Sequence, residues 1–265
     1  MAALTRKDKN GLALMGGVLA VLAAVLLLAI NDGDRLPAGP DNCHASVKAK
    51  TVILIDGSDV ITAQGSEEIV RRSLDFVREH VGVDERVSIF EVTDVSQRSL
   101  KPRFSACKPP ATGNRLNQDT RAVEKKFVQS FQKPLEDALA ASGAESSVSP
   151  ISEAVIDLSL SDYLRAERSN LLVFSDLLQH SRNTSLYGCS SGRAAIADFR
   201  AHRAGAMERP VFRNTGVYLN IVPREGLGHS VVRCRDGFWQ WFFGDNSGPG
   251  AGLQTSFLPG GAVVQ

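Results

Sequence analysis

Residues Thr51–Asp56 read TVILID, a threonine and four aliphatic residues that end in a carboxylate. An apolar run this short, without polar alternation, is typical of a strand that is buried on both faces of a parallel sheet. A longer segment with apolar residues at helical spacing follows at Ala63–His80, and a second apolar run follows at Arg86–Val92. This alternation of strand and helix indicates an α/β fold.

The same alternation continues toward the C-terminus. Further strands are expected at Leu100–Ala106, Leu171–Phe174 and Val217–Val222, and further helices at Asp119–Ala141, Pro150–Leu160, Ala194–His202 and Gly237–Phe243. In the first of these helices, Pro134 predicts a kink. We expect Leu100–Ala106 to be an antiparallel edge strand, and the C-terminal tail to close the sheet or form a last hairpin. The pattern predicts one domain over residues 46–265, a doubly wound, mainly parallel central sheet with helices on both faces.

The N-terminal segment has a different composition. Residues 11–30 read GLALMGGVLAVLAAVLLLAI and carry no charge. As a helix, this run matches the thickness of about 30 Å of a bilayer's hydrocarbon core. No small-residue cleavage triplet follows closely, which favours an uncleaved transmembrane signal anchor over a signal peptide. Because the flanking basic residues lie within residues 1–10, we expect a cytoplasmic N-terminus, a linker over residues 31–45 and a periplasmic or extracellular domain.

Charge and cysteine usage bear on the partners and the compartment. The chain has 30 Lys and Arg against 29 Asp and Glu, which leaves no basic field for nucleic acid. All four cysteines follow the apolar run, and their even number indicates two disulfides in an oxidising compartment rather than four buried thiols of a cytosolic domain. Four cysteines allow three pairings. Their positions beside the expected strands favour Cys43 with Cys107 and Cys189 with Cys234.

Oxygen-bearing side chains stand where expected strands end or helices begin. Asp56 and Ser58 follow the first strand, and Asp176 follows the strand at residues 171–174. Ser149 precedes a helix that opens with proline. Ligands of open α/β sheets bind in the crevice at the carboxyl ends of the strands. We therefore expect these four side chains to converge on one site.

In this order and spacing the residues resemble the von Willebrand factor type A domain, whose metal-ion-dependent adhesion site is built from three loops. In that family the first loop carries D-x-S-x-S, the second a threonine before a helix and the third an aspartate. Asp56 and Ser58 match the first two positions of the first loop. Ser149 stands in for the threonine, and Asp176 supplies the last carboxylate. The departure is Val60, which replaces the second serine of the first loop.

The resemblance covers Lys50–Val222 and implies a weak Mg²⁺ or Mn²⁺ site. Such hard dications prefer carboxylate, hydroxyl and water oxygens. An open coordination position could then accept an acidic group of a protein partner, so the resemblance implies a membrane-anchored protein–protein interaction module and not an enzyme. Because we expect the Asp56 carboxylate to lie in a hydrated crevice, Asp56→Ala should abolish metal binding and leave the fold intact.

Other functions remain as alternatives. Val60 favours a metal-free structural scaffold with the same fold. Haloacid dehalogenase-like phosphatases also carry an aspartate after the first strand, but they need a second one at the position of Ser58. Asp176 and His180 could form a serine hydrolase site with Ser58. A simpler interpretation is that Asp176 and His180, four residues apart, are a solvated pair on a helix. In addition, no G-x-S-x-G motif surrounds a serine. We interpret the aromatic residues within 238–243 as a helix packed on the core.

Overall fold

The computed structural model divides the chain into two compact units, Met1–Gly39 and Pro40–Gln265. It describes residues 6–33, 39, 41–43, 47–58, 61–96, 99–113, 119–141, 146–224, 226–244 and 251–259. The first unit contains the helix α1 (Arg6–Gly33), whose large apolar side chains between residues 14 and 27 are exposed. Within these described ranges, no helix meets the length and hydropathy required of a membrane span.

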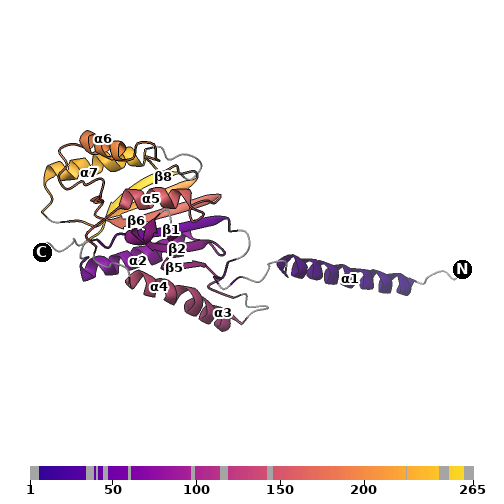
Figure 1. Ribbon diagram of the computed structural model, residues 1–265. Helices are drawn as coiled ribbons and strands as arrows, with labels where there is room; N and C mark the ends of the chain where they lie inside the picture. The colour runs from indigo at the N-terminus through magenta and orange to yellow at the C-terminus, as the bar shows by residue number, and fades with distance from the viewer. Residues whose placement is uncertain are drawn as a thin grey trace. The chain divides into compact units, whose positions relative to one another are not determined.

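The second unit is built on a six-stranded sheet of order β5-β2-β1-β6-β7-β8 (Figure 1). Its strands are β1 (Ala49–Ile55), β2 (Arg86–Glu91), β5 (Phe104–Cys107), β6 (Arg168–Ser175), β7 (Thr215–Ile221) and β8 (Gly252–Phe257). All neighbours pair in parallel except β5, which is antiparallel to β2. An antiparallel edge strand is therefore confirmed, but it covers Phe104–Cys107 instead of Leu100–Ala106, and the C-terminal segment supplies the opposite edge. A separate hairpin joins β3 (Val95–Ser96) and β4 (Ser99–Leu100).

Helices cover both faces of this sheet (Figure 1). They are α2 (Ala63–His80), α3 (Thr120–Phe127), α4 (Lys133–Ala140), α5 (Ile151–Leu160), α6 (Gly192–His202) and α7 (His229–Phe242), with a short 3-10 turn η1 (Val92–Asp94) and a π-helical segment η2 (Val128–Gln132). Consecutive residues of a strand point to opposite faces. Val52 and Leu54 of β1 pack with α5, α6 and α7, whereas Ile53 and Ile55 pack with α2 and α4. The double burial explains the uninterrupted apolar run.

The helix expected over Asp119–Ala141 is instead two α-helices joined by η2. Pro134 in the first turn of α4 explains the break. A proline has no N–H to bond the carbonyl four residues earlier, and its ring displaces that carbonyl, which here belongs to Ser130 within η2. The hydroxyl of Ser130 donates to the carbonyl of Lys126 at 2.8 Å, which satisfies one acceptor near the break.

Helix α2 begins and ends where the sequence predicts. Its N-cap Thr62 accepts a hydrogen bond from the Gly65 amide at 3.0 Å. At its other end, the Lys108 ammonium donates to the carbonyls of Val77 and Val81 at 2.8 and 2.7 Å. Burial lowers the pKa of Lys108. A lysine from the β5 side of the sheet thus satisfies the carbonyls that the helix end leaves unpaired.

Both predicted disulfides, Cys43–Cys107 and Cys189–Cys234, are present, so the favoured pairing is confirmed. The first ties the segment before β1 to the end of the edge strand β5, and the second ties the loop before α6 to α7. Paired cysteines in this number indicate an oxidising location outside the cytoplasm.

The aromatic residues of α7 belong to the core, as interpreted from the sequence. Phe238, Trp239, Phe242 and Phe243 are buried, and Phe238 meets Phe199 of α6 edge to face at 5.3 Å between ring centroids. Edge-to-face aromatic pairs contribute beyond the area that they bury. This packing fixes α7 against α6.

Candidate functional site

Asp56, directly after β1, is the centre of the candidate site. Its side chain is buried, and its Oδ2 atom accepts hydrogen bonds from the hydroxyls of Ser149 at 2.7 Å and Ser175 at 2.8 Å. Its Oδ1 atom accepts from the backbone amide of Ser58 at 3.1 Å. One carboxylate therefore joins the loop after β1, the loop before α5 and the end of β6.

The burial of Asp56 corrects the expectation of a hydrated, purely ligating carboxylate. Only 5% of the residue is exposed, because the two serines and the Ser58 amide surround its oxygens. A buried carboxylate is tolerated when it is fully hydrogen-bonded. The Ser149 hydroxyl still has two lone pairs after it donates its proton to Asp56. Asp56 thus orients Ser149 rather than facing solvent itself.

Asp176 lies in a different arrangement from the one predicted. Its Oδ1 atom accepts from the Leu178 amide at 2.8 Å, and its Oδ2 atom accepts from Arg224 Nη1 at 3.1 Å. Residues 176–180 are not helical, and Leu177 has a φ of 61°. The interpretation of Asp176 and His180 as a solvated helical pair is therefore wrong: Asp176 is buried and forms an ion pair with Arg224.

The indole of Trp239 on α7 holds this turn in place. Its Nε1 atom donates to the carbonyl of Leu177 at 2.7 Å, and both residues are buried. A left-handed φ is unfavourable for a leucine and is kept only where the surrounding structure enforces it. The α7 core packing is therefore coupled to the position of the Asp176 carboxylate.

A cavity of about 280 Å³ opens beside these residues. Its lining consists of Ser58, Ser146, Ser147, Val148, Ser149, His180, Tyr187 and Arg224. Two of the predicted site residues, Ser58 and Ser149, thus face one cavity, and Asp56 lies hydrogen-bonded to both. Asp176 is not among the lining residues and reaches the cavity through Arg224.

Arg224, Tyr187 and His180 form one wall of the cavity. Arg224 Nη1 donates to the Tyr187 hydroxyl at 2.6 Å, and the guanidinium lies 5.3 Å from the centroid of that ring. The rings of His180 and Tyr187 meet edge to face at 5.5 Å, and His180 Nδ1 lies 3.0 Å from the Ser185 hydroxyl. These contacts limit the conformations of the side chains that a ligand would meet.

Backbone hydrogen bonds join the Ser149 loop to His180 at this cavity. The Ser149 amide donates to the His180 carbonyl at 2.6 Å, and the His180 amide donates to the Ser149 carbonyl at 2.9 Å. Beside this bridge, the Gln179 side chain accepts from the Ser152 amide at 2.9 Å and so satisfies the first turn of α5. Two segments that are distant in sequence are therefore held together beside the cavity.

The placement of acidic groups bears on metal binding. No group of three or more His, Cys, Asp or Glu side chains is arranged to hold a metal ion among the described residues. The expected ligands here would be the Asp56 carboxylate, whose two oxygens already accept three hydrogen bonds, and the hydroxyls of Ser58 and Ser149. The fourth expected ligand, Asp176, forms an ion pair with Arg224. Hydroxyl and carboxylate oxygens are suitable ligands for Mg²⁺. Val60 lies outside the described residues, so its effect stays a prediction.

Sequence reasoning missed Tyr187 and Arg224. Ser175 stands beside Asp176 at the end of β6, so the sequence placed its hydroxyl at this strand end, but its bond to Asp56 was not predicted. Arg224 follows β7 by three residues and was within reach of the rule that places ligands at the carboxyl ends of parallel strands, applied to every strand. Tyr187 lies in an irregular segment after β6, and its approach to the site has no signal in the sequence.

Comparison with known proteins gives only a distant likeness. No family model and no curated protein matches the chain. Among solved structures, the chain is similar to the human COPII-coat protein Sec24c, with a TM-score of 0.35 and 12% sequence identity. The match covers 81% of this chain and 30% of the length of Sec24c. A likeness this low carries no argument about function.

Proposed function

We propose that the chain is a single-pass, membrane-anchored module, similar to a von Willebrand factor type A domain, that binds a protein partner outside the cytoplasm. The uncharged residues 11–30 support the anchor, and the two disulfides support the compartment. The parallel sheet with polar loops at its carboxyl edge supports the module. In this proposal the chain has no enzymatic activity of its own.

The contact that carries the proposal is the hydrogen bond from Ser149 to Asp56. It brings the first and second loops of the expected motif together, and Ser58 and Ser149 line the same cavity. A structural role alone would account for the bond, but it would not require a cavity lined by four serines. The cavity offers serine hydroxyl oxygens to a ligand beside the guanidinium of Arg224.

The charges at this site favour a cation as the first ligand. Ionised Asp56 and Asp176 carry two negative charges, and Arg224 carries one positive charge, so the three groups sum to −1. A Mg²⁺ or Mn²⁺ ion would change that sum to +1. The crevice would then attract an acidic group of the partner, which makes partner binding dependent on the ion.

Calorimetric titration of the full chain in detergent with Mg²⁺ and Mn²⁺ tests the ion. We expect weak binding that Ser149→Ala and Ser58→Ala weaken further, because each removes one oxygen ligand. Ser146→Ala is the matched control, since Ser146 lines the same cavity without a described bond to Asp56. If neither ion gives a heat of binding while the fold is intact, the metal-assisted function is contradicted.

A metal-free binding scaffold is the second candidate, and the ion pair of Asp176 with Arg224 favours it. In that case the site keeps its charge of −1 and prefers a basic group. Crosslinking capture with and without chelator separates the two candidates. Loss of the partner with chelator supports the ion, and unchanged capture supports the scaffold.

A reporter that is active only in the cytoplasm, fused after Gln265, tests the topology. It should be inactive, and activity would refute an external domain.

A further inference from the structure

The edge strand β8 has features of an interaction surface. All six of its residues, GLQTSF, are exposed, and it carries no charge and no proline. Within the described part of the chain, no further strand pairs with its outer side. Natural edge strands usually carry charges, prolines or bulges that prevent pairing with another chain. An edge strand that lacks such features is suited to pairing.

The two faces of β8 differ in character. Parallel partners share a face, so Leu253 and Phe257 lie on the same face as Val217 and Ile221, their register partners in β7. The β7 residues belong to the core under α5, α6 and α7. Leu253 and Phe257 continue this apolar face beyond the core, and 42% and 60% of their surfaces are exposed.

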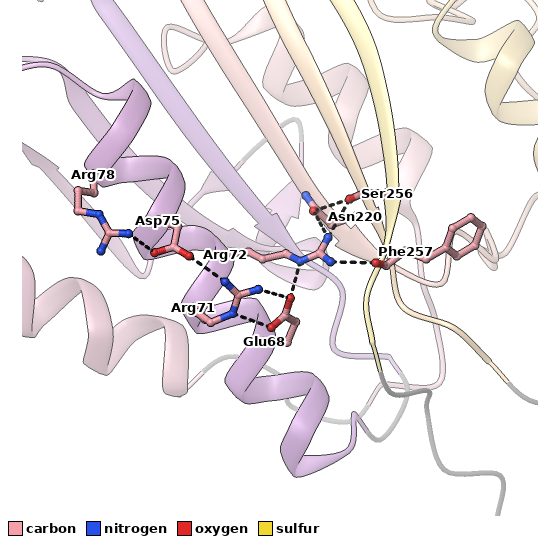
Figure 2. Close-up of polar contacts among 8 residues, drawn as sticks. All are labelled: Glu68, Arg71, Arg72, Asp75, Arg78, Asn220, Ser256 and Phe257. Carbon is pink, nitrogen blue, oxygen red and sulfur yellow. Dashed lines mark hydrogen bonds and ion pairs between the residues drawn. The ribbon is translucent and has the colours of Figure 1, made fainter.

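The other face is polar and is anchored by Arg72 of α2 (Figure 2). Arg72 Nη1 donates to the Ser256 hydroxyl at 2.8 Å, and Nη2 donates to the Phe257 carbonyl at 2.9 Å. The charge of Arg72 is balanced by Glu68, which accepts from its Nε atom at 2.7 Å. These bonds hold the edge strand in place and leave it without a net charge that would repel a second strand.

The direction of the backbone groups fixes which residues can pair outward. The Leu258 amide donates to the Ile221 carbonyl of β7 at 2.8 Å, so its backbone groups point toward β7. Because these directions alternate along a strand, the backbone groups of Leu253, Thr255 and Phe257 point away from β7. An antiparallel partner must place its own outward-pointing residues opposite them.

We propose that two copies of the chain associate through their β8 strands, paired antiparallel about Thr255. In this register Leu253 lies opposite Phe257 of the partner subunit, and Phe257 lies opposite the partner subunit's Leu253. Both apolar pairs form on the same face, next to the existing core, and the two sheets become continuous. Cross-strand pairs of an aromatic and an aliphatic residue stabilise antiparallel sheets.

The strand is its own complement, which favours a second copy over another partner. With Thr255 at the two-fold axis, all three outward-pointing residues find a partner of the same kind. A shift by two residues leaves Leu253 or Phe257 without its apolar counterpart. The Phe257 carbonyl can accept from both Arg72 and the second strand, because it has two lone pairs.

Thr255→Cys in the full chain in detergent micelles tests this pairing. Directly opposed residues of a hydrogen-bonded antiparallel pair have Cα atoms about 5.5 Å apart, within the range of a disulfide. We expect mild oxidation to link most of this variant into dimers. Leu253→Cys alone should give few, since the two copies of residue 253 would lie four residues apart along the strands. A mixture of Leu253→Cys and Phe257→Cys should give mixed dimers.

Two outcomes would overturn the inference. One is the combination of two results: wild type is monomeric by light scattering, and the Thr255→Cys variant stays monomeric after oxidation at the same concentrations. The other is equal crosslinking of Leu253→Cys alone and Thr255→Cys, which would show random collision instead of a register. Metal titration and partner capture are separate measurements, so failure here leaves the proposed function untouched.

Discussion

Replacing Asp56 by alanine should destabilise the fold, because three segments depend on its carboxylate. Hydrogen bonds to a charged acceptor contribute about 1.5–3 kcal/mol each. Asp56 accepts two from hydroxyls, and Ser149 and Ser175 are only 3% and 1% exposed, so water cannot easily replace the lost acceptor. Removing a buried charge offsets part of this loss. We expect a net loss of about 3 kcal/mol in the free energy of unfolding.

Urea unfolding at neutral pH with both disulfides intact, followed by tryptophan fluorescence, measures this loss. Trp239 is buried in the core and reports on it. With a denaturant dependence of about 2–3 kcal/mol per molar urea, the midpoint should fall by about 1 M. Asp56→Asn keeps one side-chain oxygen as an acceptor and should lose about half as much. A midpoint for Asp56→Ala within about 0.2 M of wild type, on the same denaturant dependence, would refute the structural role.

Three further predictions concern other contacts. Hydrogen bonds from the Arg71 side chain, helped by Arg72, lower the pKa of Glu68 from its ordinary value of 4.5 to about 2. The stabilisation from this carboxylate is therefore present above pH 4.5 and is lost as the pH falls toward 2, and Glu68→Gln should flatten this dependence in acid unfolding curves. Replacing both Cys189 and Cys234 by serine should lower the free energy of unfolding by about 4 kcal/mol, because the bridge spans 45 residues. Thermal unfolding measures this loss, and an unchanged melting temperature would contradict it. Lys108→Met should lower stability by about 1 kcal/mol, because carbonyls of α2 lose a donor, and Lys108→Arg should lose less.

The main elements of the fold could be predicted from the sequence because each depends on local pattern. The run at residues 51–56 is short, aliphatic and bounded by a carboxylate, and it forms the central strand. Helix α2 has a threonine cap and a strong apolar stripe, so its ends were predictable. The disulfides followed from the positions of the cysteines beside strands. Pro134 also predicts an interruption of the helix, but the π-helical form of the break depends on how the chain relieves a local clash.

The candidate site was predicted only in part. The rule for strand ends located Asp56, Ser58 and Ser149, because it depends on topology alone. It could not assign the partner of Asp176, since an ion pair with Arg224 spans 48 residues of sequence and depends on tertiary packing. Nor could it reveal that Asp56 is buried, because burial depends on the serines that surround its side chain.

The disulfide between Cys43 and Cys107 has a mechanical consequence. A pulling force that enters from the N-terminal helix reaches Cys43 and divides there between the backbone and the covalent bridge to the end of β5. The 64-residue interval contains β1, α2 and β2, and tension along the bridge cannot extend it. At about 3.4 Å per residue, some 200 Å of chain is thereby withheld from stretching. Strands β1 and β2 would stay tied to β5 under a strain that unravels the C-terminal strands.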